Sequence, residues 1–196
     1  MGRDFDDRLR AILDGAADVF YHRGFQQGTL TEIADRVGLT QPALYHYVDS
    51  KDQLLQRIMN QVASDLTGAL ASALSEEGTA TERLRRIIQQ VANAIIENQQ
   101  TFAVYWQELK SLPQDLHDRI REDERGFVDG VAAVVAGAQK EGSLPPDQPT
   151  WVLTEGILGM VCWIYQWYSP QGPTTGDEIA FSFCRMLGLA GTPDIT

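Results

Sequence analysis

The stretch that most constrains this chain is GTLTEIADRVGLTQPALYHYVDSKDQLL, residues 28–55. Its spacing predicts two short helices joined by a tight turn, with a third helix starting directly afterwards. Thr29 and Glu32 have the spacing of a capping box, in which two side chains satisfy backbone N–H groups at a helix start. Gly38 supplies the positive φ that ends this helix. The pattern is that of a helix-turn-helix, whose second helix enters the major groove of DNA.

The second of these helices is predicted to start after Thr40, a capping residue, with Pro42 in its first turn, where a proline loses no hydrogen bond. Leu44 and Val48 lie four residues apart and face inward. The remaining side chains face outward, where a glutamine can pair with adenine and apolar groups suit thymine methyls. The residues predicted to contact DNA are Thr29, Thr40, Gln41, Pro42, Ala43, Tyr45, His46, Tyr47 and Lys51.

Three of these residues have a simpler alternative role. His46 can be exposed without contacting DNA, Tyr45 can pack against the helix upstream, and Lys51 can be a solvated charge. A phosphate contact from Lys51 would affect binding to all DNA sequences alike, whereas a base contact from Gln41 would affect discrimination between bases.

An apolar stripe upstream predicts the helix against which these short helices pack, because helices this short cannot bury a core alone. The stripe recurs with helical period over residues 9–20 and consists of Leu9, Ile12, Leu13, Ala16, Ala17 and Phe20. Ser50 and Gln53 have the spacing of another capping box, which starts a long linker helix.

Beyond these local signals, the N-terminal quarter of the chain resembles TetR-family transcriptional regulators. The resemblance is carried by Thr29 with Ile33-Ala34, by Val37-Gly38-Leu39, by Tyr45, and by Lys51 through Leu54. The run QPALYHYV, residues 41–48, is similar to the recognition helix of the tetracycline repressor, although much of the family has His-Phe where Tyr47-Val48 stand here.

This resemblance implies an all-α TetR-like fold of about nine helices. It implies a helix-turn-helix DNA-binding domain over residues 1–55 and a ligand-binding and dimerisation domain over residues 56–196. It also implies a homodimer on a palindromic double-stranded DNA operator, because a two-fold protein mirrors a two-fold site. Repression is the common role in the family, and activation stays open.

The rest of the chain has helical spacing and no strand-like segment. The expected features are a helix capped by Thr81, a short helix over Thr101–Leu112, a long helix from about Leu116 to Lys140, a linker over residues 141–149, a helix over Trp151–Tyr168, and a last helix capped by Thr175 with Glu178. The segment Trp151–Tyr168 is apolar nearly all round, which is typical of a helix buried on several sides.

In the TetR family the last two helices pair with those of a partner as a four-helix bundle. Small residues admit close approach of two helices. The residues that fit such a dimer interface are Gly156, Gly159, Phe183, Met186 and Leu187, with an ordinary intramolecular core as the alternative.

An aromatic set would converge if the middle helices bundle as they do in the family, and such sets line pockets for bulky apolar ligands. It consists of Phe102, Tyr105, Trp106, Phe127, Trp163 and Trp167, and an ordinary core is again the alternative. The run WIYQWYSPQGP, residues 163–173, resembles acyl-CoA-responsive repressors of fatty-acid and steroid degradation, and residues 104–112 resemble their sixth helix. The resemblance implies a small apolar or amphipathic effector, such as an acyl-CoA.

Gln166 and Ser169 stand where that group often carries arginine, so two positive charges are missing for the phosphates of CoA. Other cations would have to bind them, or else serve only as solvated charges: Lys110, Arg119, Arg121 and Arg125.

The net charge of −11 is unusual for a DNA-binding chain. Residues 1–60 contain seven Lys or Arg against nine Asp or Glu, a net charge of −2. Phosphate anchoring must therefore come largely from neutral donors and helix N-termini. We expect operator affinity to depend only weakly on salt.

No pattern predicts an enzyme, a cofactor or a metal site: the three histidines lack ligand spacing, and no glycine-rich phosphate loop occurs. The start, MGRDFDDRLR, is charged and joins the first helix, so no signal peptide is predicted. The longest apolar run, Gly156 to Tyr165, is too short to span a bilayer, so no membrane segment is predicted. Cys162 and Cys184 lie in apolar helical contexts, which fits a cytoplasmic protein. The alternative function is a helical protein-interaction adaptor whose helix-turn-helix no longer binds DNA.

Overall fold

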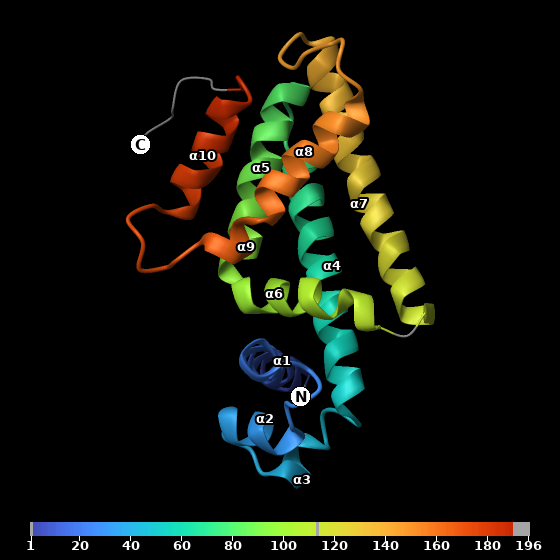
Figure 1. Ribbon diagram of the computed structural model, residues 1–196, viewed down its shortest axis with the longest axis vertical. Helices are drawn as coiled ribbons and strands as arrows, with labels where there is room; N and C mark the ends of the chain where they lie inside the picture. The colour runs from blue at the N-terminus through green and yellow to red at the C-terminus, as the bar shows by residue number, and fades with distance from the viewer. Residues whose placement is uncertain (1, 113, 190–196) are drawn as a thin grey trace. The chain divides into compact units, whose positions relative to one another are not determined.

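The computed structural model describes residues 2–112 and 114–189, which form helices joined by turns and loops and contain no strand (Figure 1). This confirms the all-α fold class. The elements are α1 (Gly2–Arg23), α2 (Leu30–Arg36), α3 (Gln41–Leu44), α4 (Lys51–Ser75), α5 (Ala80–Glu97), α6 (Gln99–Glu108), the 3₁₀ turn η1 (Leu109–Ser111), α7 (Gln114–Lys140), α8 (Thr150–Cys162), α9 (Ile164–Trp167) and α10 (Gly176–Met186).

The described residues form two compact units. The first, called the head here, comprises residues up to 63 together with 99–120. The second, called the body, comprises residues 64–98 and those from 121 onward. The helix α6 thus packs with the N-terminal helices, and α4 and α7 each continue from one unit into the other.

The core of the head is built on α1, which packs against α2 and α6 (Figure 1). The predicted apolar stripe is the buried face of α1, with Ile12, Ala16 and Phe20 almost fully enclosed. Phe20 meets Phe25 edge to face, with ring centroids 5.2 Å apart. The turn after α1 is therefore anchored to the same core.

Local capping defines the two short helices as predicted. Thr29 and Glu32 form both hydrogen bonds of a capping box at the start of α2. Gly38 has a φ of +66° and ends the helical segment. The Thr40 hydroxyl accepts a hydrogen bond from the Ala43 amide at 3.3 Å and so caps α3.

Two capping predictions need correction. Ser50 accepts a hydrogen bond from the Gln53 amide at 3.1 Å, but the Gln53 carboxamide oxygen accepts from the Asp49 amide at 2.9 Å, so the box is only half formed. Thr81 does not cap α5. Thr79 is the N-cap, and the Thr81 hydroxyl instead donates to Glu141 Oε2 at 2.6 Å.

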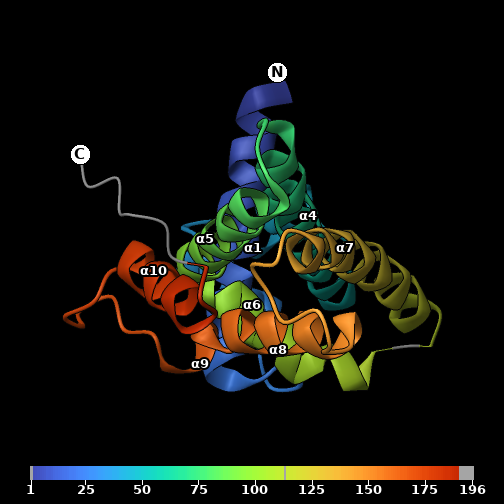
Figure 2. The same ribbon diagram turned by 90° about the horizontal axis from the view of Figure 1, so that it is seen from above.

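The body is organised around α5, which packs against α8, α9 and α10 (Figure 2). Its predicted apolar face is buried as expected, including Leu84, Ile88 and Ile95. The linker over residues 141–149 and the Thr175–Glu178 capping box of α10 are also confirmed. The two cysteines, Cys162 and Cys184, are free thiols, and burial raises the pKa of both.

The segment Trp151–Tyr168 differs from expectation in two ways. The helix is interrupted at Trp163, between α8 and α9. Only one side of α8 is buried within the chain, through Thr154, Ile157, Leu158 and Val161. The prediction of burial on several sides was therefore wrong for a single chain, because Trp151, Val152, Gly156 and Gly159 of α8 are exposed. Over the described residues, no helix is both long and apolar enough to cross a membrane.

Candidate nucleic-acid interface

The short helix α3 presents a polar and aromatic surface to solvent. Gln41, Pro42, Tyr45 and His46 are exposed, Tyr45 by 49%, and Ala43 is half-buried. Behind them, Leu44 and Val48 are almost completely buried in the head. The predicted division into an inner and an outer face is therefore present, and the outer face has the residue types that read base edges.

Gln41 is held across the turn by a residue that the sequence did not single out. The Thr31 hydroxyl on α2 donates a hydrogen bond to Gln41 Oε1 at 3.3 Å. The separation of the two residues along the chain follows no helical spacing, so the contact arises only when α2 and α3 fold against each other. It orients the carboxamide that is predicted to read a base.

The two capping threonines differ in what they can still donate. The Thr29 hydroxyl donates to Glu32 Oε2 at 2.9 Å, so its only hydrogen is already used. The Thr40 hydroxyl accepts from Ala43 and has no acceptor among the described residues. A hydroxyl has one hydrogen to donate. The Thr40 hydroxyl, at the start of α3, can therefore still donate it to a phosphate oxygen, whereas the Thr29 hydroxyl cannot.

Tyr47 follows α3 and stacks on Phe5 of α1. The ring centroids are 5.0 Å apart and the planes are inclined by 22°. Tyr47 is half-buried, while Phe5 remains 45% exposed. Sequence reasoning missed Phe5 because it lies on the polar first turns of α1.

Lys51, at the start of α4, is engaged inside the head. Its ammonium donates to the backbone oxygens of Phe25 at 2.7 Å, Gln26 at 3.1 Å and Gly28 at 3.1 Å. The same nitrogen lies 4.6 Å from the centroid of the Phe25 ring. The ammonium therefore points toward the protein, and the phosphate contact predicted from the sequence remains a prediction.

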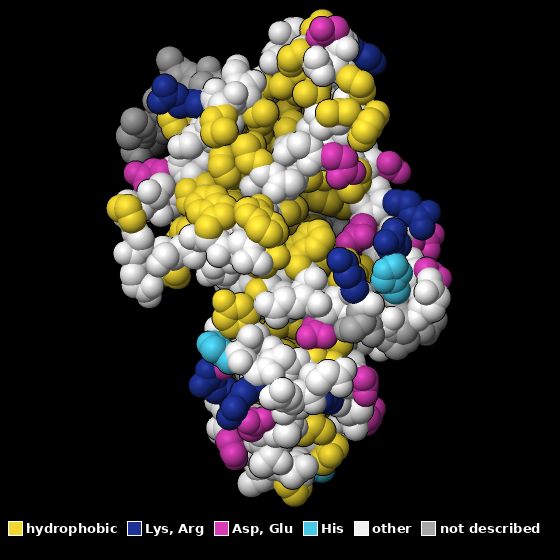
Figure 3. Space-filling view, in the orientation of Figure 1, with side chains coloured by type: hydrophobic (Ala, Val, Ile, Leu, Met, Phe, Trp, Pro, Cys, Tyr) yellow, Lys and Arg dark blue, Asp and Glu magenta, His cyan; other side chains and the backbone are white. Residues whose placement is uncertain are grey.

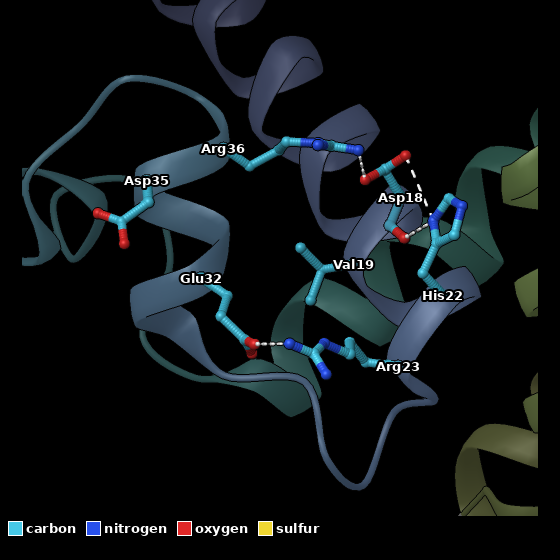
Figure 4. Close-up of a pocket in the computed structure, with 7 residues that line it drawn as sticks. All are labelled: Asp18, Val19, His22, Arg23, Glu32, Asp35 and Arg36. Carbon is cyan, nitrogen blue, oxygen red and sulfur yellow. Dashed lines mark hydrogen bonds and ion pairs between the residues drawn. The ribbon is translucent and has the colours of Figure 1, made fainter.

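Arg23 and Arg36 of the head are also paired, around a shallow pocket between α1 and α2 (Figure 4). Arg36 forms an ion pair with Asp18, which also lies 3.5 Å from His22 Nδ1. Arg23 lies 3.5 Å from a Glu32 oxygen. Figure 4 shows these pairs on either side of Val19. The positive charges of these arginines are thus largely offset within the protein.

Two further contacts belong to the same network. The Arg8 guanidinium donates to the backbone oxygen of Val37 at 3.3 Å. Hydrogen bonds from the Thr29 hydroxyl and amide hold the pKa of Glu32 below its ordinary value. Glu32 therefore stays ionised beside Arg23 and offsets the charge of that arginine.

The residues predicted to line an effector pocket are divided between the two units. Phe102 and Tyr105 on α6 are buried in the head, and Phe127 on α7 is buried in the body. The three tryptophans of the set, Trp106, Trp163 and Trp167, are exposed by 39%, 58% and 49%. A shared pocket formed by all six remains a prediction.

The predicted dimer residues lie on the surface of the body. Gly156 and Gly159 are exposed, and an added Cβ at either would meet open space. Met186 is 74% exposed, while Phe183 and Leu187 are half-buried. Figure 3 shows hydrophobic side chains gathered on the visible face of the body. The exposed large apolar residues of the body are Leu74, Trp151, Val152, Trp163, Trp167, Phe181 and Met186.

Comparisons with known proteins agree with this architecture. The family model of bacterial regulatory proteins of the tetR family matches residues 12–58. The model of the tetracyclin repressor-like C-terminal domain matches residues 77–189, more than half of the chain.

Individual relatives match along most of their length. The chain is 27% identical over 187 residues to the HTH-type transcriptional repressor KstR2 of Rhodococcus jostii, covering 93% of this chain and 91% of that protein. It resembles the crystal structure of the regulator PfmR of Thermus thermophilus, with 26% identity, a TM-score of 0.81, and coverage of 90% and 96% of the two chains. It also resembles AibR in complex with isovaleryl coenzyme A and operator DNA, with 28% identity, a TM-score of 0.78, and coverage of 93% and 97%. This chain belongs to the TetR family of bacterial transcriptional regulators.

Proposed function

We propose that this protein is a ligand-responsive repressor that binds a palindromic operator as a homodimer and is released by a small apolar or amphipathic effector. The observation that carries the proposal is the exposed row of Gln41, Pro42, Tyr45 and His46 on α3, backed by the buried Leu44 and Val48. Such a helix places several readable side chains at the major groove at once.

The direct test is a footprint on the DNA upstream of the gene for this protein. We expect a two-fold symmetric protected site, with half-sites separated by about 10–10.5 bp or a multiple of it. The test variant, Tyr45→Ala with His46→Ala, should lose the footprint. Its melting temperature should stay that of the wild type, because both side chains are exposed. Equal binding to random DNA would contradict the proposal, and no DNA binding at all would favour the protein-interaction adaptor.

The homodimer is supported by the apolar surface of α8 and α10. A contiguous apolar patch of this kind on a water-exposed face marks an association site. Gly156 and Gly159 on α8 leave room for a second helix, since a Cβ added at either position would have no neighbouring atom. Sedimentation should give a dimer for the wild type and a monomer for Gly159→Arg, whereas Gly126→Arg at an exposed position of α7 should remain dimeric.

The effector is proposed to be an acyl-CoA thioester. This rests on the resemblance of residues 163–173 to acyl-CoA-responsive repressors and on the similarity to AibR, which was crystallised with isovaleryl coenzyme A. A panel of acyl-CoA chain lengths, tested against free CoA at micromolar levels, should raise the melting temperature and release operator DNA. If neither thioesters of fatty acids nor those of steroids act, the effector belongs to another class.

Effector binding can release the operator if the effector-bound dimer and the operator-bound dimer favour different distances between their two helix-turn-helix units. A coupling free energy of about 1–3 kcal/mol, or about 5–150-fold in affinity, is sufficient. The helix α4 is the natural lever, because it begins at the helix-turn-helix and continues into the body.

A further inference from the structure

Lys51 uses all of its hydrogen-bonding capacity inside the head. An ammonium group has three N–H donors, and the Lys51 ammonium meets three backbone oxygens at 2.7, 3.1 and 3.1 Å. The face of the Phe25 ring covers the same nitrogen at 4.6 Å. No N–H of this ammonium is left over for a phosphate oxygen while these hydrogen bonds persist.

The three acceptors belong to the tight turn between α1 and α2. This turn starts at Gly24, which has a φ of +76°. It ends at Gly28, where an added Cβ would lie 3.1 Å from side-chain atoms of both Phe20 and Val19. In this closely packed turn the backbone oxygens of Phe25, Gln26 and Gly28 all point toward the Lys51 ammonium. A single donor group with three hydrogens satisfies them, and a buried carbonyl left without a donor is destabilising.

The Lys51 contact joins the two ends of the helix-turn-helix segment. Gly28 directly precedes the N-cap of α2, and Lys51 is the first residue of α4. The 3.1 Å bond between Lys51 Nζ and the Gly28 oxygen therefore joins the two ends of the segment that carries α2 and α3. With its ends tied, the segment can be held in one orientation on α1.

We propose that Lys51 is a positioning residue for operator recognition: it ties the start of α4 to the α1–α2 turn and so fixes the orientation of α3, and it is not a phosphate contact. The proposal rests on the proposed DNA-binding function. It assigns the charge of Lys51 to the internal stability of the head, in line with the pairing of Arg23 and Arg36 in the same unit.

The test compares the wild type with Lys51→Met and Lys51→Arg in the full-length chain. For each, melting and binding to operator and to random DNA are measured over a range of salt concentrations. We expect both variants to bind the operator about tenfold more weakly, with little change on random DNA. The slope of log K against log salt should stay that of the wild type. Lys51→Arg should fail to restore binding, because a planar guanidinium cannot place three hydrogens on three converging carbonyls. Lys110→Met, at an exposed lysine of the same unit, is the control.

Other outcomes overturn the proposal. If Lys51 neutralises a phosphate, the slope for Lys51→Met becomes shallower by about 0.9 for each head, or about 1.8 for the dimer, affinity falls equally on operator and random DNA, and Lys51→Arg keeps full activity. A purely structural role would lower the melting temperature but leave the ratio of operator to random affinity unchanged in the folded variants. If the wild type itself binds no DNA, the proposed function fails, and this is distinct from a failure of the Lys51 assignment.

Discussion

Asp18 Oδ1 accepts a hydrogen bond of 3.1 Å from Gln100 Nε2, and the other oxygen of the same carboxylate is paired with Arg36. One side chain of α1 therefore joins the start of α6 to α2 of the helix-turn-helix, all within the head. Glu108, at the other end of α6, accepts a hydrogen bond of 3.4 Å from the Phe25 amide. The helix α6 is thus fixed near its start to α1 and at its end to the turn between α1 and α2.

Replacing Asp18 with asparagine should lower the free energy of unfolding by about 1 kcal/mol, because the Arg36 ion pair is removed while the side-chain volume is kept. Chemical denaturation measures this value. Asp14→Asn is the matched control on the same helix. Burial raises the pKa of Asp14, so the folded state disfavours its charge and the variant should be as stable as the wild type or slightly more so. Equal destabilisation by both variants would contradict the role of Asp18.

The salt dependence of operator binding should be weak. The head pairs Arg8, Arg23, Arg36 and Lys51 with its own groups. Each phosphate contact contributes about −0.9 to the slope of log K against log salt, so a dimer with about three such contacts per head gives a slope of about −5. Fluorescence anisotropy over a salt series measures it. A slope of about −10, as for a strongly basic repressor, would contradict the prediction that neutral donors and helix N-termini make most of the phosphate contacts.

Thr31→Val should reduce discrimination at the base that Gln41 reads, because the hydroxyl that orients the Gln41 carboxamide is removed. We expect a decrease of roughly 0.5–1.5 kcal/mol in operator preference, typical of one neutral hydrogen bond. Competition binding with single-base operator variants measures it. Thr31→Ser keeps the donor and is the control, and a comparable decrease in both variants would show that the hydroxyl is not responsible.

Glu141 should make the body sensitive to acid. It accepts hydrogen bonds from the Ala80 amide at 2.7 Å and from the Thr81 amide at 2.9 Å. The bond from the Thr81 hydroxyl, together with these two, lowers its pKa from the ordinary 4.5. Because the folded-state pKa is depressed, the carboxylate stabilises the fold above about pH 4.5, and this contribution is lost as the pH falls through the lower folded-state value.

Glu141→Gln should therefore be less stable than the wild type at neutral pH, with the difference shrinking below about pH 4. Denaturation at a series of pH values checks this. Glu122→Gln, at an exposed glutamate of α7, should show no such convergence. A stability difference that is constant with pH would mean that Glu141 acts through packing and not through its charge.

Sequence reasoning succeeded where the determinants are local. The capping boxes of Thr29 and Thr175 involve neighbouring residues of one helical turn, and the turn glycine Gly38 needs only its own φ. It failed where a distant group decides. Thr81 has the spacing of an N-cap, yet its hydroxyl bonds Glu141, which lies 60 residues further along the chain.

The same limit applies to the interface. The outward face of α3 follows from helical spacing, so Gln41 and His46 were predicted correctly as exposed. The carbonyls around Lys51 and the Asp18 junction are set by how α1, α2 and α6 pack, and no spacing along the chain encodes them. Spacing alone also cannot show that an apolar helix such as α8 leaves one face uncovered in a single chain.

The central claim is that α3 reads bases. It is tested most directly by the ratio of operator to random-DNA affinity for the wild type and for Gln41→Ala, measured by anisotropy at one salt concentration. We predict that the binding free-energy preference for operator over random DNA falls by about 1–3 kcal/mol, the contribution of one good bidentate base contact, while affinity for random DNA is unchanged. Equal decreases on both DNAs, or no decrease on either, would contradict the claim.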